Sequence, residues 1–206
     1  MSDRDFDYLD GSLRNYIESL SAKTPVPGGG SAVACVASLS SSLIGMVLHY
    51  TFGKERYLAY GEELKRIKAE NDDISMRLSD YIEKDSMIYE NIRKHTKENP
   101  ALAENFLKES AQMHLDICRK TLRLMIFAEI LAVKGNKNLI SDTAISAQLA
   151  IAAFRSGRIN MLVNIKYIKD VKFCEEVLSE ADIMEKDIEN RNLSVYLESK
   201  EQLRDK

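Results

Sequence analysis

Apolar residues recur at helical spacing along almost the whole chain, and the strict alternation typical of strands is rare. The most distinctive stretch is the uncharged run 32–48, which is apolar on nearly every side and rich in alanine and serine. A helix of this kind belongs in the interior of a protein, and its small side chains let neighbouring helices approach closely. We therefore predict a central helix here, closed by Gly53 as a C-cap.

Periodic segments on both sides of this run predict five further helices. The first begins near Asp10 or Ser12 and ends before Pro25, with Leu13, Tyr16, Ile17 and Leu20 as its apolar stripe. The others cover about 57–97, the segment between Asn99-Pro100 and Gly135, the segment from 143 to 155, and the tail from 170 to 206. The tail carries Phe173, Val177, Ile183, Met184 and Ile188 and is expected to form an outer or dimer-facing helix.

Composition supports an all-α protein. The 206 residues include no tryptophan, three prolines and nine glycines, and good helix formers dominate. The length favours one domain or a pair of small ones, and we predict one helical bundle over residues 1–206. The net charge of −3, with acids and bases interspersed, gives no indication of a nucleic-acid surface.

The sulfur and imidazole side chains give little sign of a metal site. The three cysteines lie far apart among apolar neighbours, which predicts small buried side chains in a reducing compartment: Cys35, Cys118 and Cys174. The three histidines share no metal-binding spacing, and His114 is read as a packed or surface residue: His49, His95 and His114. These spacings predict a protein without a bound metal. The acidic start, Met1 to Asp5, has no apolar segment of a signal peptide, so we expect a cytoplasmic protein.

The run 32–48 approaches the length of a membrane span, which raises an alternative. Its serines and glycine, and the lack of a basic flank before it, favour a buried helix of a soluble protein. A membrane-associated helical protein is the other possibility.

The stretch from Lys23 to Ser31 reads Lys-Thr-Pro-Val-Pro-Gly-Gly-Gly-Ser and leads directly into the central helix. Pro25 and Pro27 stiffen the approach, Gly28, Gly29 and Gly30 allow close contact with the backbone, and Ser31 is a good N-cap. Such a helix start suits a carboxylate, a phosphate or the edge of a polar heterocycle. The stretch lacks the lysine of a P-loop and the spacing of a dinucleotide fingerprint, and a linker ending in a capped helix is the plain alternative.

Two polar residues, Asn71 and Asp85, fall on the apolar stripe of the long helix 57–97. Burial of a lone carboxylate is costly, so Asp85 must pair, shift its pKa or face a cavity. A structural salt bridge and a functional role are both open for it. Tyr89 lies one turn later and points the same way.

A second polar stretch, Gly135 to Asp142, leads into the alanine-rich helix from residue 143. On a helix, Asp142 shares an apolar face with Ile145 and Leu149; alternatively, Ser141 or Asp142 caps the helix. Asn160 and Asn164 lie four residues apart and share one face.

These stretches together resemble the formiminotransferase-cyclodeaminase C-terminal family, the cyclodeaminase and cyclohydrolase enzymes of tetrahydrofolate. The similarity rests on Lys23 to Ser31 with its small-residue helix, on Asp85 to Tyr89, and on Gly135 to Asp142 with Asn160 and Asn164. It covers nearly the whole chain from Leu13 to Phe173. One departure is His114, at a position where the family often has proline.

The resemblance implies a helical homodimer that binds a tetrahydrofolate derivative in a cleft near the subunit interface, without a metal or prosthetic group. Members either close 5-formiminotetrahydrofolate to 5,10-methenyltetrahydrofolate with loss of ammonia or hydrolyse the methenyl ring to 10-formyltetrahydrofolate. We expect the first reaction. The second reaction and a non-catalytic folate-binding dimer are the alternatives.

Roles for individual residues follow from this resemblance together with the chemistry. Asp85 and Asp142 are the catalytic candidates, because cyclodeamination needs a base for the N10 proton and an acid for the departing amine. The candidate substrate-binding residues are Lys23, which would meet an anionic glutamate tail, Pro27, Gly28, Gly29, Gly30, Ser31, Tyr89, Asn136, Asn138, Ser141 and Asn164.

Overall fold

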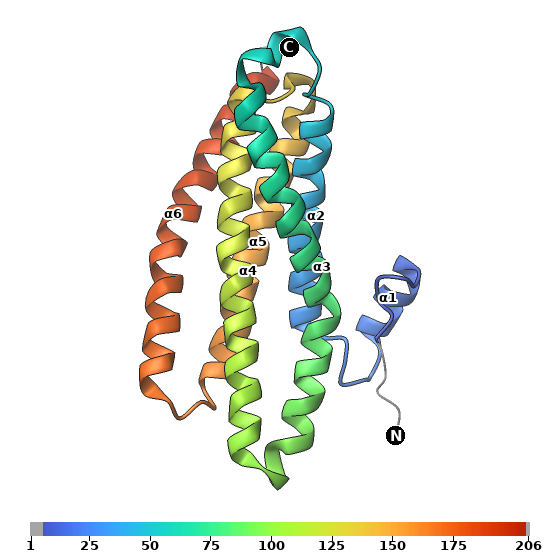
Figure 1. Ribbon diagram of the computed structural model, residues 1–206, viewed down its shortest axis with the longest axis vertical. Coiled ribbons are helices and arrows are strands. Elements are labelled where there is room, and N and C mark those ends of the chain that lie inside the picture. Colours follow the sequence, from blue (N-terminus) through green and yellow to red (C-terminus); the bar gives the residue numbers. More distant parts are fainter. Residues whose placement is uncertain (1–5, 205–206) are drawn as a thin grey trace.

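The computed structural model describes residues 6–204, so the acidic start Met1 to Asp5 lies outside the described residues. Within that range the chain forms six α-helices, two short 3-10 helices and no strand (Figure 1), which confirms the all-α prediction. The α-helices are α1 (Leu13–Ser21), α2 (Gly29–His49), α3 (Gly61–Glu98), α4 (Pro100–Lys134), α5 (Ile140–Ile165) and α6 (Val171–Arg204). The 3-10 helices are η1 (Glu55–Tyr60) and η2 (Lys137–Leu139).

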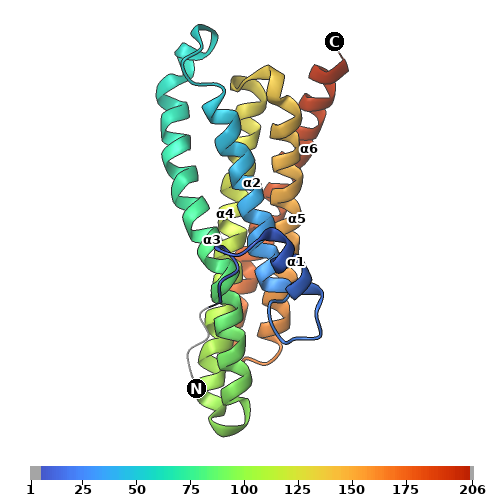
Figure 2. The same cartoon turned by 90° about the vertical axis from the view of Figure 1, so that its right-hand side faces the viewer.

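The uncharged helix α2 is central, as its sequence indicates. It packs against α3, α4 and α5, while α6 covers the far side of α4 and α5 (Figures 1 and 2). Ala34, Ala37, Ile44 and Val47 on α2 are completely buried. The short helix α1 lies beside the N-terminal half of α2, at the edge of the bundle.

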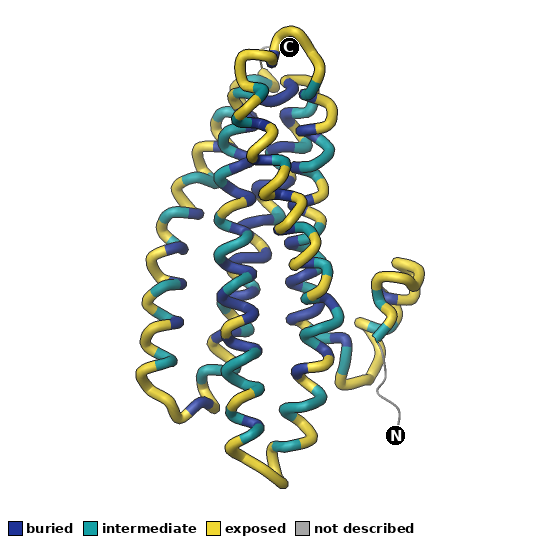
Figure 3. The backbone as a smooth tube through the Cα atoms, viewed as in Figure 1, coloured by how far each residue is buried: buried dark blue, intermediate teal, exposed yellow. Residues whose placement is uncertain are grey.

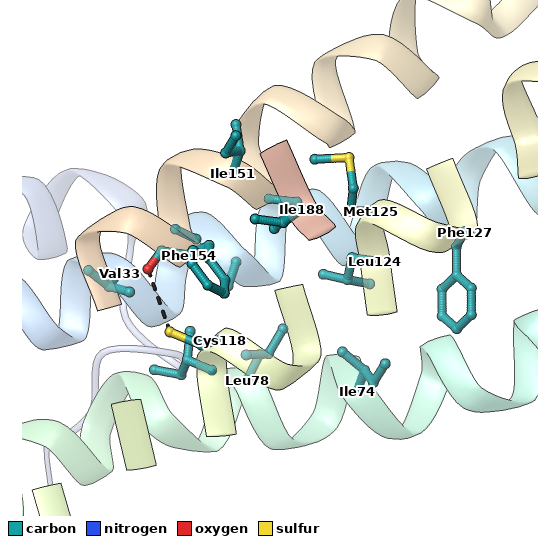
Figure 4. Packing of buried hydrophobic residues seen from close by; sticks show 14 of the residues in the cluster. Val33, Ile74, Leu78, Cys118, Leu124, Met125, Phe127, Ile151, Phe154 and Ile188 are labelled. Carbon is teal, nitrogen blue, oxygen red and sulfur yellow. Dashed lines mark hydrogen bonds between the residues drawn. The ribbon is translucent and has the colours of Figure 1, made fainter. Parts of the chain in front are cut away.

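The core runs along the bundle between these helices (Figure 3). Side chains from α2 to α6 interdigitate in it, including Leu78, Phe127, Phe154 and Ile188 (Figure 4). Each such side chain contributes about 1.5–3 kcal/mol on burial. Cys118 is buried here, its thiol 3.5 Å from the Phe154 carbonyl oxygen; Cys35 and Cys174, which are free like Cys118, are only partly buried.

The polar side chains of α2 are bonded to neighbouring helices. Ser40 Oγ donates to the Ser146 carbonyl oxygen at 2.8 Å, and Ser41 Oγ donates to Asn71 Oδ1 at 3.1 Å. Asn71 Nδ2 returns a bond to the Ser41 carbonyl oxygen at 3.2 Å, so this buried amide has a structural role. By length and composition alone α2 could span a membrane, with a mean hydropathy of 1.9, but half of that window is buried inside the bundle.

Several predicted helix ends differ from the structure. Gly28, rather than Ser31, is the N-cap of α2, and Tyr50, rather than Gly53, is its C-cap. Gly53 adopts a φ of +74° in the turn that follows, a left-handed conformation that favours glycine. Leu139 caps α5, so neither Ser141 nor Asp142 is its cap. The start of α4 is as predicted, because Asn99 Oδ1 accepts from the Leu102 N–H ahead of Pro100.

The two terminal helices bury less of their stripes than expected. On α1 only Tyr16 is buried, whereas Leu13, Ile17 and Leu20 are exposed. On α6, Val177, Met184 and Ile188 are buried, but Ile183 is 70% exposed because it faces away from α4 and α5. The exposed stripe of α1 therefore lacks a partner within the described part of the protomer.

Candidate active site at the start of α2

The first turn of α2 receives the carboxylate of Asp85 from α3. The Ser31 N–H donates to Asp85 Oδ2 at 2.9 Å, and the side chain of Asp85 is only 14% exposed. No side chain caps this helix start, since Gly28 has none. A carboxylate from another helix thus bonds one of the free N–H groups of the first turn, where the helix dipole favours negative charge.

Gly30 makes this approach possible. A Cβ atom at this position would lie 2.0 Å from Asp85 Oδ1, which is far inside any allowed contact. Gly29 is less tightly enclosed, with Asn160 Oδ1 3.5 Å from where its Cβ would lie. Gly28 has no neighbour within 4 Å of such an atom. The glycine whose small size the structure requires is therefore Gly30.

His114 on α4 completes the surroundings of Asp85. Its Nδ1–H donates to the Ser110 carbonyl oxygen at 2.8 Å, and its Nε2 lies 3.9 Å from Asp85 Oδ1 with no hydrogen-bond partner among residues 6–204. The ring is 1% exposed. Sequence reasoning missed this residue, because a histidine in an apolar stripe is usually a packed one. Its only signal was its place on the buried face of α4, which packs against the helix of Asp85.

Burial of this pair changes both titrating groups. Burial raises the pKa of the Asp85 carboxyl, while the nearby imidazole and the Ser31 N–H oppose this shift. Burial lowers the pKa of His114, while Asp85 and the Ser110 carbonyl oppose that shift. Both directions favour a neutral pair with the proton on the carboxyl group. A carboxyl with a raised pKa can donate a proton near neutral pH.

The N-terminal segment covers this cluster. The hydroxyl groups of Tyr16 on α1 and Ser31 are 3.0 Å apart, and the ring of Tyr8 packs edge-on against Tyr16. Glu83 Oε1 accepts from the Tyr8 N–H at 2.8 Å, which ties the segment to α3. Burial raises the pKa of both phenols, so Tyr16 and Tyr8 stay neutral here.

The end of α5 supplies amide groups to the same region. Asn164 Nδ2 donates to Ser110 Oγ at 2.9 Å and to the Asn160 carbonyl oxygen at 3.1 Å. Since Ser110 also accepts from His114, these residues connect α5 with the His114–Asp85 pair. Asn164 thus lies beside Ser110 on α4, and its amide is already bonded within the chain.

A groove of about 340 Å³ starts at this point and runs between α2 and α5. Small or aliphatic residues line most of it, with Asn160 and Gly29 at its end next to Asp85: Gly29, Ala32, Val33, Val36, Ala152, Ala153, Ser156, Ile159 and Asn160. A flat heterocycle can lie against such a surface, with polar groups at one end to orient it.

Three other predicted residues lie near the glycine loop with different exposure. Lys23 is exposed in the segment between α1 and α2, where its ammonium is available to an anion. Pro27 is buried and follows a cis peptide bond. Tyr89 is 45% exposed, one turn beyond Asp85 on α3.

The second predicted cluster lies at the other end of α2. Asn136 is buried, and its Nδ2 donates to the Tyr50 carbonyl oxygen at 2.9 Å while its Oδ1 accepts from the Asn138 N–H at 3.2 Å. Asn138 and Ser141 are exposed, and Asp142 is half-buried in the first turn of α5. On the face of α5 that Asp142 shares, Ile145 is exposed and Leu149 is partly exposed.

One protomer does not bring the two clusters together. The helices α2 and α5 run antiparallel, with Ser40 bonded to Ser146 between the ends. The stretch from Ser31 to Ser40, continued from Ser146 back to Asp142, spans roughly 20 Å at ~1.5 Å per residue. Asp85 and Asp142 of the same chain are therefore too far apart to act on one atom.

A largely buried carboxyl at a glycine-rich helix start, facing an imidazole and next to an apolar groove, defines an enzyme-like acid–base site in an all-α bundle. The model of the formiminotransferase-cyclodeaminase family matches residues 12–183, and the chain belongs to this family.

Individual relatives agree with this assignment. The chain is 30% identical over 181 residues to a methenyltetrahydrofolate cyclohydrolase from Methylorubrum extorquens, covering 83% of this chain and 87% of that protein. It is 26% identical to the formimidoyltransferase-cyclodeaminase of Rattus norvegicus over 82% of this chain, but spans only 33% of that longer protein. The solved structure of formiminotetrahydrofolate cyclodeaminase from Thermotoga maritima matches with a TM-score of 0.89 and 31% identity, covering 94% of this chain and 98% of that one.

Proposed function

We propose that this protein is a tetrahydrofolate one-carbon enzyme that converts 5-formiminotetrahydrofolate to 5,10-methenyltetrahydrofolate with release of ammonia. The observation that carries the proposal is the buried Asp85 carboxyl, held by the Ser31 N–H on one oxygen and facing His114 with the other. Relatives named for cyclodeaminase and cyclohydrolase activities support the folate substrate.

The reaction needs one proton to move between two nitrogens of the substrate. N10 attacks the carbon of the protonated formimino group, whose nitrogen already carries two hydrogens, and forms the new N–C bond, and a base takes the N10 proton. The N–C bond to the formimino nitrogen then breaks as an acid protonates that nitrogen, which leaves as ammonia. A carboxyl group with a raised pKa suits both steps, so Asp85 can take the N10 proton and pass it to the departing amine.

The groove between α2 and α5 is the proposed place for the folate. Its apolar walls suit the flat pterin, and Gly29 and the amide of Asn160 lie at its Asp85 end. The exposed Lys23, in the segment before Gly29, is the proposed contact for an anionic glutamate tail. Hydrolysis of methenyltetrahydrofolate is the second candidate, because a cyclohydrolase is among the relatives at 30% identity and the same carboxyl could activate water.

Absorbance of the methenyl chromophore separates the two reactions. The purified protein is given 5-formiminotetrahydrofolate in one cuvette and methenyltetrahydrofolate in another. Growth of the signal with stoichiometric ammonia supports cyclodeamination, and faster decay of added methenyltetrahydrofolate supports hydrolysis instead. If neither signal changes faster than the blank, the enzyme proposal is wrong and a non-catalytic folate-binding dimer replaces it.

We also propose that the protein is a homodimer joined through the outer face of α2 and α5. Apart from His49 at its end, α2 has no ionisable side chain other than Cys35, and its outward Leu39 is 52% exposed. On α5, Ile145 and Ile159 are 50% and 61% exposed, and α5 lies beside α2 in the bundle (Figure 2). Interhelical ion pairs join α3 to α4, α4 to α6 and α5 to α6, for example Arg119–Glu180. An uncharged strip of this length is typical of a covered interface.

A twofold axis across the middle of this strip would solve the separation of Asp85 and Asp142. In a twofold interface, each end of the α2–α5 face contacts the other end of the same face on the second copy. Asp142 of one copy would therefore approach the glycine loop of the other. Asn138 and Ser141 would come with it. The predicted second catalytic group thus becomes a contribution of the partner subunit.

Mixing two inactive variants tests this arrangement. Asp85→Asn and Asp142→Asn homodimers are each expected to be impaired, but their heterodimer holds one site with both carboxylates intact. After subunit exchange the mixture should recover about a quarter of wild-type turnover, since half of the dimers are mixed and each has one intact site. No recovery on demonstrated exchange contradicts a shared site. Leu39→Lys should give monomers in sedimentation, whereas Met76→Lys, at a more exposed position on α3, should not.

A further inference from the structure

The imidazole of His114 has a fixed proton on one nitrogen and a free position on the other. Its Nδ1 lies 2.8 Å from the Ser110 carbonyl oxygen, which can only accept, so Nδ1 carries the hydrogen. Its Nε2 is buried, has no hydrogen-bond partner in the described part of the chain, and lies 3.9 Å from Asp85 Oδ1. A buried nitrogen without a partner is costly, which makes this geometry significant.

The carboxyl group of Asp85 is arranged to meet that nitrogen. Its Oδ2 already accepts from the Ser31 N–H at 2.9 Å, so the remaining Oδ1 is the oxygen free to carry a proton. The 3.9 Å gap is longer than a hydrogen bond, so the two side chains must move closer before a proton can pass between them. The clash that a Cβ on Gly30 would cause shows how tightly α2 confines this carboxyl.

The groups that contact the pair are neutral, and the carboxylate of Glu83 on α3 lies behind Tyr8, where it accepts from the Tyr8 N–H. From the N-terminal segment and α1 the phenols of Tyr8 and Tyr16 face it, α2 offers only the backbone N–H and hydroxyl of Ser31, and α5 offers the amides of Asn160 and Asn164. Among the residues that the structure describes, His114 is the only basic group within 4 Å of Asp85. The protonation states of these two residues therefore depend mainly on each other.

We propose that Asp85 and His114 hold one proton between them, and that His114 is a positioning residue that stores this proton while Asp85 exchanges another with the substrate. Burial places the resting proton on Asp85, whose O–H points at Nε2. When N10 gives up its proton, the stored proton moves to Nε2 and Asp85 Oδ1 takes the one from N10. Asp85 then protonates the departing amine, and the stored proton returns, so the pair ends as it began.

This inference rests on the proposed function for its role in turnover, but the shared proton itself can be observed without a substrate. In protein with ¹⁵N-labelled histidine, Nδ1 of His114 should remain protonated and Nε2 bare at neutral pH. As the pH is raised, Nε2 should show one titration step when the shared proton leaves the pair. This step should be absent in Asp85→Asn, and should persist in Asp80→Asn, which changes an exposed carboxylate on the same helix. An Nε2 signal that is independent of pH, or identical in wild type and Asp85→Asn, overturns the proposal.

Kinetics of two His114 variants separate proton storage from packing. His114→Leu keeps an apolar core but removes the acceptor, whereas the Oε1 atom of His114→Gln can still accept. The alkaline limb of kcat reports the pH at which the shared proton leaves the pair. In His114→Leu the Asp85 O–H has no acceptor and no Nε2 lone pair faces the carboxylate, so this limb should move at least about one pH unit lower. The value of kcat should be at least about tenfold lower, and KM should change less than about threefold. His114→Gln should recover part of both. Equal losses in both variants with an unmoved limb contradict a role in proton storage.

The Nε2 titration and the methenyl absorbance assay test different parts of the proposal, so one can fail without the other. If neither folate substrate reacts but the Nε2 step is present and sensitive to Asp85→Asn, the shared proton stands and the proposed reaction is wrong. If methenyltetrahydrofolate forms but the step is absent, the reaction stands and the storage role of His114 is wrong.

Discussion

The two ends of the α2–α5 pair use buried polar residues in opposite ways. At the Asn136 end, the amide bonds Tyr50 and Asn138, its backbone N–H donates to Thr51 Oγ1 at 3.0 Å, and both sides of the side chain are satisfied. At the Gly30 end, a largely buried carboxyl faces a buried imidazole, and one ring nitrogen has no partner among the residues that the structure describes. A complete network stabilises the fold, whereas an incomplete one leaves bonding capacity for a reacting group.

Of the substitutions that compare the two ends of the α2–α5 pair, Asp85→Asn should have the largest effect, and this effect is on turnover. Loss of the ionisable group should lower turnover at least about a hundredfold, because acid–base catalysis typically contributes that much. Rates with the reactive folate, measured by methenyl absorbance, check this. Asp80→Asn on the same helix is the control, since its side chain is exposed and should leave turnover unchanged. Near-normal turnover of Asp85→Asn would remove this carboxyl from the mechanism.

Gly30→Ala tests how closely the fold confines the carboxyl. Its Cβ would lie 2.0 Å from Asp85 Oδ1, so the backbone or the carboxyl must shift, at a cost of about 1–3 kcal/mol in the free energy of unfolding. Urea unfolding measures this loss. Gly61→Ala is the matched control, because nothing lies within 4 Å of its added Cβ and unfolding should be unchanged or slightly harder. Similar values for the two variants would mean that Asp85 has room to move.

At the opposite end, Asn136→Ala should act on stability. It removes the donor to the Tyr50 carbonyl and the acceptor of the Asn138 N–H, which costs about 1–3 kcal/mol in the free energy of unfolding. Asn138→Ala should change this free energy by less than about 0.5 kcal/mol, since that side chain is exposed. Thermal and urea unfolding of both variants check the difference. Equal stability would show that the Asn136 network is not structural.

The dependence of stability on pH gives the smallest and most specific effect. Burial lowers the folded-state pKa of His114 below its ordinary 6.5. In Asp85→Asn, the unfolded chain gains a proton as pH falls through 6.5 and the folded protein does not, so the free energy of unfolding should fall by up to about 1.4 kcal/mol per pH unit until the folded pKa is reached.

In the wild type the raised pKa of Asp85 supplies the opposite change. Between pH 3.8 and 6.5, and below the raised pKa of Asp85, the folded pair holds one proton on Asp85, and the unfolded chain holds one on His114. The pair therefore adds no slope to the plot of unfolding free energy against pH. Urea unfolding at several pH values from 5 to 7 compares the two proteins. Parallel curves for wild type and Asp85→Asn would contradict a coupled pair.

Most of the fold could be predicted because helical periodicity is a local signal. The uncharged run 32–48 and the Asn99-Pro100 start of α4 lie as expected, and Asp85 and Asn71 lie on the buried stripe of α3. Helix caps were less predictable, because the start of α2 is bonded by a carboxylate 54 residues away rather than by a local side chain.

The site was only partly predictable for the same reason. Its position follows from Asp85 and the glycine loop, but the role of His114 depends on how α4 packs against α3. The roughly 20 Å between Asp85 and Asp142 likewise follows from the antiparallel packing of α2 and α5, which periodicity does not specify. The roles of Ser141 and Asn138 stay predictions that depend on the proposed second subunit.

The long sequence separation within the bundle also has a consequence for protein synthesis. The bond from Ser40 on α2 to the Ser146 carbonyl joins residues 106 positions apart. At ~5–20 residues per second, the ribosome needs roughly 5–20 s to make the intervening chain. During that interval the apolar helix α2 has left the ribosome before its partner α5 exists, so the nascent chain presents a hydrophobic segment suited to chaperone binding until the second half of the bundle arrives.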